Sequence, residues 1–161
     1  MSAQAKKSET DSTGVSNSLT IGRLVLRLEA AGILELEGIL GGEFTAAVDA
    51  IFALGDQGRL VVSGMGKSGH VARKIAATLA STGTPALFVH AGEASHGDLG
   101  MVTTRDAVLV LSNSGETPEV ADMVNYCHRF AIPLIAMVGK ADSALGSAAN
   151  ITLALPDITE A

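Results

Sequence analysis

The side chains best suited to chemistry follow short apolar runs and stand among glycines. Residues 60–62 form one such run, and the turn after it carries a lysine and a serine between glycines: Gly64, Gly66, Lys67, Ser68 and Gly69. Residues 107–111 form another, and hydroxyl, amide and glycine residues follow it: Ser112, Asn113, Ser114, Gly115 and Thr117. A turn that leads into a helix presents unpaired N–H groups, which bind phosphate. One hydroxyl could simply cap the helix, but the second turn holds more donors than a cap uses. We therefore expect phosphate-binding turns at both places.

Two familiar nucleotide motifs fit the first turn poorly. A P-loop would need its first glycine at position 61, which is Val61. The dinucleotide pattern G-x-G-x-x-G is present, but the acid expected about 20 residues later is missing, since the next strand ends at His90 with Glu93 beyond it. The glycines could also serve only a tight turn, which leaves Lys67 unexplained.

Three ionisable residues near these turns could move protons on a bound sugar phosphate: Lys67, His96 and Glu119. Shifting a hydrogen between neighbouring carbons needs a base, an acid for the oxygens and a positive charge beside the developing enediolate. Each residue also has an ordinary interpretation, as a solvated helix lysine, a loop histidine and a favourable first-turn acid. Their joint occurrence after three strand ends favours a site.

His90 ends a strand beside the loop that holds His96. It is either a buried neutral histidine or a ligand for a divalent metal with few other protein ligands. A structural zinc site is not expected, because Cys127 is the only cysteine and no closed ligand spacing occurs.

These residues must be positioned by an alternation of strands and helices. The patterns predict strands over 60–62, 86–90, 107–111, 133–138 and 151–155, and helices over 71–80, 118–130 and 142–149. Pro118, with Thr117 as N-cap, marks one helix start. We therefore expect an α/β fold with a doubly wound, five-stranded parallel sheet. A helical hairpin over 19–40 and 43–54 precedes it, for packing or subunit contact. Residues 1–18 are polar and predicted to be a disordered tail before a single domain over 19–161.

The composition limits the classes of ligand and partner that the chain is expected to bind. The formal net charge is −6, and aromatic residues make up 3% of the chain without any Trp, which argues against nucleic acid as a ligand. No stretch is apolar enough for a membrane span or a signal peptide core, so we expect a cytoplasmic protein. An anionic ligand must then be held by local charges and helix ends.

The motifs resemble a known family. The blocks GMGKSGH (64–70), EASHGDLGM (93–101) and SNSGE (112–116) are similar to those of the arabinose-5-phosphate isomerases, members of the sugar isomerase (SIS) domain superfamily with a flavodoxin-like fold. The resemblance covers residues 20–161. It implies interconversion of D-ribulose 5-phosphate and D-arabinose 5-phosphate, for synthesis of 3-deoxy-D-manno-octulosonate in lipopolysaccharide or capsule, with no required cofactor.

The resemblance also implies roles for single residues. The catalytic lysine falls on Lys67, the catalytic glutamates on Glu119 and Glu160, and a substrate-contacting histidine on His96. Gly83 and Thr84 would line the substrate pocket, and His90 would bind zinc. Family members are usually tetramers, which suits the helical hairpin. Because the family continues with a further catalytic histidine and often two CBS modules, we expect this chain to stop before the end of the domain and to be of uncertain activity alone. The alternatives are a sugar-phosphate-sensing SIS module and a SIS isomerase of another phosphosugar.

Overall fold

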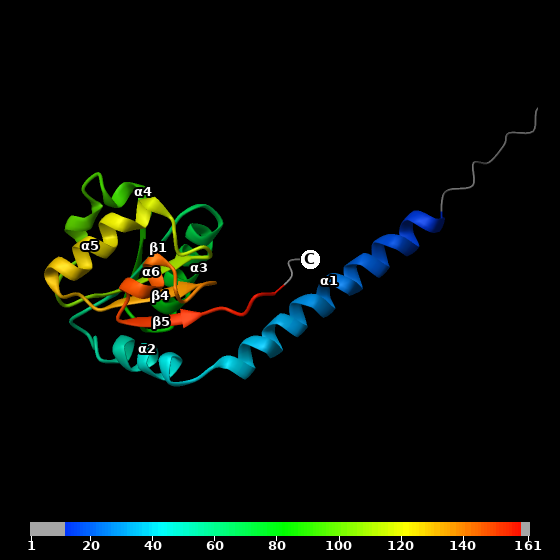
Figure 1. Cartoon of the computed structure of the whole chain (residues 1–161), viewed down its shortest axis with the longest axis horizontal. Helices are drawn as coiled ribbons and strands as arrows, with labels where there is room; N and C mark the ends of the chain where they lie inside the picture. The colour runs from blue at the N-terminus through cyan, green and yellow to red at the C-terminus, as the bar shows by residue number, and fades with distance from the viewer. Residues whose placement is uncertain (1–11, 159–161) are drawn as a thin grey trace, which may run out of the picture. The chain divides into compact units, whose positions relative to one another are not determined.

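The computed structural model describes residues 12–158, which fall into two compact units: residues up to Gly38 with Ile158, and Ile39–Asp157. The first unit is essentially one helix, α1 (Ser12–Ile39), shown in blue in Figure 1. The helix begins at Ser12, whereas helix formation was predicted only from residue 19. Once a helix has formed, extending it by a turn or two costs little free energy, even for polar residues. Composition alone does not reveal such an extension. Residues 1–11 of the predicted tail lie outside the described residues.

The apolar side chains of α1 are largely exposed. Leu26, Ile33 and Leu34 have 65–70% of their surface open to solvent. The amphipathic pattern is therefore present, but α1 does not bury it within its own unit. Because α1 and α2 belong to different units, the hairpin between them stays a prediction.

The second unit is the α/β domain (Figure 1). Its elements in chain order are α2 (Gly42–Phe52), β1 (Leu60–Gly64), α3 (Gly66–Ser81), β2 (Ala86–His90), α4 (Ala91–Ala94), the 3-10 helix η1 (Asp98–Met101), β3 (Ala107–Ser112), the 3-10 helix η2 (Pro118–Val120), α5 (Ala121–Phe130), β4 (Leu134–Val138), α6 (Ala144–Ala148) and β5 (Ile151–Ala154). The strands form one five-stranded sheet in the order β2-β1-β3-β4-β5, with every pair parallel. This is the doubly wound, flavodoxin-like order, so the predicted fold class is confirmed.

The sheet is buried on both faces, as parallel sheets are. β1 and β3 are buried at every position. One core cluster packs on the side of α4, α5 and α6, around Met123, Leu134 and Leu145. The other packs on the side of α2 and α3, around Ala47, Ala72 and Ile135. The sheet is thus a rigid support for the loops at its two edges.

Two element boundaries matter for the site. β1 runs on to Gly64 rather than ending at Val62, because Ser63 and Gly64 continue the ladder opposite Val89 and His90. α3 begins at Gly66 rather than at residue 71. Lys67 and Ser68 therefore stand in the first turn of a helix and not in a loop before it.

Candidate functional site

Parallel strands bring their carboxyl ends to one edge of the sheet, and β2, β1 and β3 are neighbours there. Lys67 follows β1, His96 follows β2 and Glu119 follows β3. α4 also packs against η2, which joins the segments after β2 and β3. All three side chains are exposed, and within residues 12–158 they form no hydrogen bond or ion pair. The strand order therefore brings the segments that carry these three residues to one edge of the sheet, with the side chains open to solvent.

The turn between β1 and α3 is shaped by glycine. Gly66 has a φ of +55°, which other residues rarely adopt. At Gly64, a Cβ would lie 3.0 Å from the carbonyl oxygen of Leu111, so β1, β3 and α3 approach closely here. No side chain caps the N-terminus of α3. This leaves its first N–H groups available beside the exposed Lys67.

The turn after β3 is built around the buried hydroxyl of Ser112. Its Oγ lies 2.8 Å from Oγ1 of Thr117 and accepts a hydrogen bond of 3.1 Å from the amide of Gly115. Thr117 is the N-cap residue of η2, as predicted, but its hydroxyl pairs with Ser112 and makes no cap bond. Ser112 therefore shapes the turn from inside.

Two donors of this turn face outward. Asn113 and Ser114 are exposed. The hydroxyl of Ser114 accepts a hydrogen bond of 3.2 Å from the amide of Glu116, which leaves its own hydrogen free to donate to an anion. Of the predicted phosphate-binding residues on this turn, these two have side chains that present donors to solvent.

His90 is the N-cap of α4. Its Nδ1 accepts a hydrogen bond of 3.2 Å from the amide of Gly92, and its ring packs edge-on against Phe88. Only Nε2 is then open to a metal. Among the described residues, no group of three or more His, Cys, Asp or Glu side chains could hold a metal ion. The described residues therefore supply fewer than three such ligands at this place, which does not make a closed site.

Gly83 and Thr84 are not brought to this edge. They immediately precede β2, at the amino end of the strands, roughly 16 Å away along a five-residue strand. There they help line an apolar pocket of about 510 Å³ with Ile51, Phe52 and Leu79. One phosphosugar at the carboxyl edge cannot touch them in the same chain. Glu160 lies outside the described residues.

Sequence reasoning missed the network at the amino edge. Asp106 is 2% exposed, and its carboxylate accepts hydrogen bonds from the backbone and side chain of both Arg59 and Thr103. Burial by itself raises the pKa of Asp106, but the hydrogen bonds from Arg59 and Thr103 outweigh it and leave the pKa below its usual range. Arg59 directly precedes β1 and Asp106 directly precedes β3, and the pairing of these two strands could have suggested the contact.

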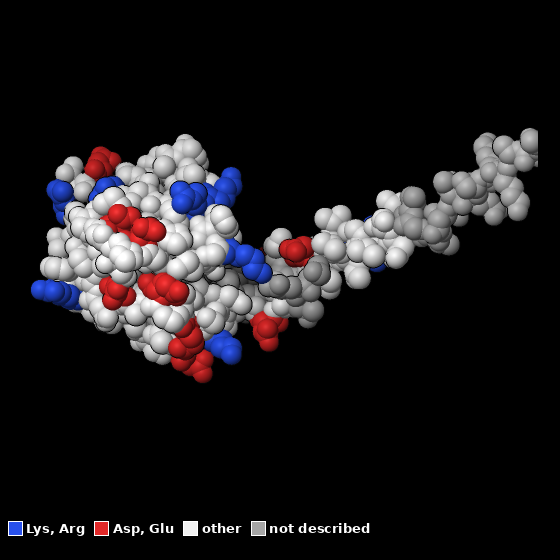
Figure 2. All heavy atoms as spheres, turned by 90° about the horizontal axis from the view of Figure 1, so that it is seen from above, with Lys and Arg blue, Asp and Glu red and all other residues white. Residues whose placement is uncertain are grey.

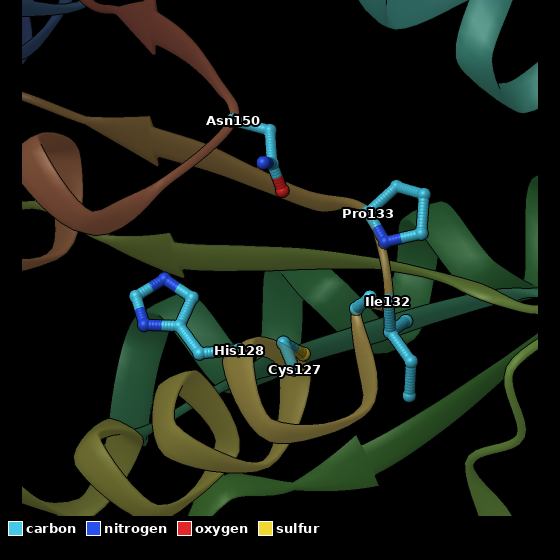
Figure 3. Close-up of a pocket in the computed structure, with 6 residues that line it drawn as sticks. Cys127, His128, Ile132, Pro133 and Asn150 are labelled. Carbon is cyan, nitrogen blue, oxygen red and sulfur yellow. The ribbon is translucent and has the colours of Figure 1, made fainter.

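A second pocket lies at the same amino edge, where α5 ends and β4 begins (Figure 3). It has a volume of about 530 Å³ and is lined by Cys127, His128, Ala131, Ile132, Pro133 and Asn150. Nε2 of His128 lies 2.8 Å from the carbonyl oxygen of Ala148. Because a carbonyl can only accept, Nε2 carries the hydrogen and donates it. Burial raises the pKa of the Cys127 thiol to about 12, so the thiol is protonated and unreactive.

Surface charge does not point to a polyanion. On the face of the α/β unit seen in Figure 2, acidic and basic side chains are interspersed rather than forming a continuous basic surface. Of the helices in the described part of the chain, none has the length and apolarity needed to cross a membrane.

Comparison with known proteins identifies the family. A family model described as the SIS domain matches residues 53–161, which is most of the chain. The chain belongs to the SIS domain family. Relatives named arabinose 5-phosphate isomerase KdsD are 50% identical over 134 residues in Yersinia pestis and 51% identical over 126 residues in Pseudomonas aeruginosa. These alignments cover 83% and 78% of this chain, but only 40% and 38% of the relatives, so the SIS chain spans about two fifths of their length.

A solved structure supports the same assignment of the SIS fold. The E. coli CFT073 protein c3406, described as a complex with A5P, is 35% identical and superposes with a TM-score of 0.83. The match covers 89% of this chain and 75% of that protein.

Proposed function

We propose that this SIS chain catalyses, as part of an arabinose-5-phosphate isomerase, the interconversion of D-arabinose 5-phosphate and D-ribulose 5-phosphate. One observation carries the proposal: Lys67, His96 and Glu119 follow three adjacent strands at one sheet edge, beside a turn lined by exposed donors. The sequence identity to the named isomerases supports the choice of substrate. The product would serve synthesis of 3-deoxy-D-manno-octulosonate.

The residues divide between binding and proton transfer. The phosphate binds Ser114, Asn113 and the first N–H groups of α3, with Gly66 and Ser68 in that turn. A base, Glu119 or His96, takes the proton from C2 of the aldose while the carbonyl oxygen at C1 gains a proton, which gives an enediol. Return of a proton to C1 and loss of the proton on the C2 oxygen give the ketose. Lys67 stabilises the negative charge that develops on the oxygens, and Glu160 is a second carboxylate for these transfers.

We also propose that the active form is a homotetramer. Two observations support association: α2 has an apolar side chain, Phe52, that is 88% exposed, and α1 exposes most of its apolar residues. Association also offers Gly83 and Thr84 a route to a substrate, since these residues of one copy can face the carboxyl edge of another. Measurement of the molecular mass in solution tests the tetramer. If the protein is active and monomeric at the concentration of the assay, the tetramer proposal is wrong.

The zinc assignment at His90 rests on a single available ring nitrogen. If zinc binds, Nε2 of His90 is one ligand, and the described residues of one chain do not complete the site. Zinc titration of the protein and of His90→Ala tests this. Equal zinc affinity would exclude His90. A cytoplasmic location stays a prediction.

Proton exchange followed by NMR tests the isomerase. D-ribulose 5-phosphate in D₂O should gain deuterium at C1 in the presence of the protein, and arabinose 5-phosphate should appear. Binding of arabinose 5-phosphate is measured in parallel by calorimetry. Binding without deuterium exchange would favour the sugar-phosphate-sensing module. If the protein shows no binding and no exchange, the proposal is refuted.

A further inference from the structure

The turn after β3 is fastened to the segment after β4. The amide of Gly139 donates to the carbonyl of Asn113 at 2.9 Å, and the amide of Leu145 donates to the carbonyl of Gly115 at 3.0 Å. A third bond comes from a side chain, since Oε1 of Glu116 accepts a hydrogen bond of 2.9 Å from the amide of Ala144. The Ser112–Thr117 turn is therefore held along its length by residues 139–145.

The contact between the two segments is close as well as hydrogen-bonded. A Cβ on Gly115 would meet the side chain of Ser143, and Gly115 has a φ of +68°. A Cβ on Gly139 would lie 2.8 Å from the carbonyl oxygen of Asn113. Ser143 is buried and donates to the carbonyl of Lys140 at 2.6 Å. Residues 139–145 therefore pack closely against the Ser112–Thr117 turn and limit its movement.

Glu116 is not needed to start α6. Ser143 already caps that helix, since its Oγ accepts a hydrogen bond from the amide of Gly146. Yet Glu116 is exposed and reaches across 28 residues of sequence to Ala144. A carboxylate beside an anion site repels the anion, so its presence there calls for a compensating role. The hydrogen bond from Ala144 supplies one, because it fixes the residue whose backbone amide donates to the hydroxyl of Ser114.

We propose that Glu116 is a positioning residue, whose carboxylate anchors the turn to α6 so that Ser114 and the neighbouring amides are held ready for a phosphate. The inference rests on the proposed function for the identity of the ligand. It adds to that function a residue that does not itself touch the substrate.

Calorimetry with arabinose 5-phosphate and with inorganic phosphate tests it on three variants. Glu116→Ala should weaken binding roughly tenfold, since a hydrogen bond to a charged group is lost. Glu116→Gln should bind within about threefold of the unchanged protein, because its amide oxygen also accepts from Ala144. Glu43→Ala is the matched control, since Glu43 accepts from the amide of Thr152 away from this edge, and it should bind normally.

Amide exchange gives a readout that needs no ligand. The Leu145 amide, which donates to Gly115, should exchange roughly tenfold faster in Glu116→Ala than in Glu116→Gln or Glu43→Ala. Unchanged exchange and binding in Glu116→Ala would overturn the proposal. So would tighter binding in both Glu116 variants, which would show a charge effect alone. If the unchanged protein binds neither ligand but Glu116→Ala speeds exchange, the anchoring stands and the proposed function fails.

Discussion

In the part of the chain that the structure describes, a charged side chain is buried and paired at the amino edge of the sheet, and others are exposed and unpaired at positions along its carboxyl edge. At the amino edge, Asp106 is buried and every oxygen of its carboxylate is hydrogen-bonded, to Arg59 or Thr103. At the carboxyl edge, Lys67 and Glu119 are exposed and, within the described residues, have no partner. The same sheet supports both edges.

This difference separates what holds the fold from what acts on a ligand. A buried charge costs stability unless it is paired, so the Asp106 network must be complete before the domain is stable. Unpaired charges at the other edge contribute little to stability and can bind a partner from solution. Substitutions at the two edges should therefore affect different measurements.

The largest effect is expected for Glu119→Gln. If Glu119 moves a proton, the substitution should lower the rate of isomerisation by about 10³-fold, within the range for loss of a general acid or base. The midpoint of thermal unfolding should stay within about 1 °C, because the side chain is exposed and unpaired. Asp122→Asn, an exposed acid in the first turn of α5, is the matched control. Unchanged turnover in Glu119→Gln would remove Glu119 from the chemistry.

Asp106→Asn should show the reverse pattern. Asparagine has one acceptor oxygen and a donor NH2 group where the carboxylate has two acceptors. Some of the Arg59 and Thr103 donors therefore lose their partner, and the free energy of unfolding should fall by about 3 kcal/mol. Turnover per folded molecule should be unchanged. Urea unfolding and an isomerisation assay below the transition give the two values. Asp142→Asn, at an exposed position, controls for loss of charge. If Asp106→Asn lost turnover without losing stability, the amino edge would not serve stability alone, and the contrast between the two edges would be wrong.

The same carboxylate makes stability depend on pH. Because the pKa of Asp106 is lower in the folded state than in the unfolded state, its stabilising contribution is complete above the unfolded pKa of about 4. That contribution is lost as the pH falls through the folded pKa. The difference in unfolding free energy between the unchanged protein and Asp106→Asn should therefore shrink from pH 7 to pH 3. A constant difference would mean that ionisation of Asp106 does not stabilise the fold.

The fold was predictable from the sequence because its signals are local. Apolar runs such as 107–111 and breaks such as Gly64 to Gly66 identify strands and turns. The alternation of elements then gives a parallel sheet, and the parallel sheet places Lys67, His96 and Glu119 at one edge. The ends of elements were less accurate, as at α1 and α3, where tertiary context and helix extension decide the boundary.

The contacts of the site were less predictable because they join distant segments. The pattern around Ser112 and Thr117 indicated helix capping or phosphate binding, but their mutual hydrogen bond depends on how the turn closes. The reach of Glu116 to Ala144 depends on the pairing of β3 with β4. Gly83 and Thr84 were assigned by resemblance to one pocket, and only the three-dimensional fold shows them at the opposite edge.

The smallest predicted effect compares two serines at the carboxyl ends of neighbouring strands. Ser63 on β1 is fully buried, and its hydroxyl has no hydrogen-bond partner among the described residues, whereas Ser112 on β3 is buried with two. Ser63→Ala removes an unsatisfied hydroxyl and should raise the unfolding free energy by about 1 kcal/mol. Ser112→Ala leaves the Thr117 hydroxyl without its partner and removes one of the two acceptors of the Gly115 amide, which keeps the carbonyl of residue 112. It should lower the unfolding free energy by about 1–2 kcal/mol. Chemical unfolding of both variants decides the sign. If Ser63→Ala were as destabilising as Ser112→Ala, the Ser63 hydroxyl would have a partner such as a buried water, and the turn after β1 would be tied down as firmly as the turn after β3.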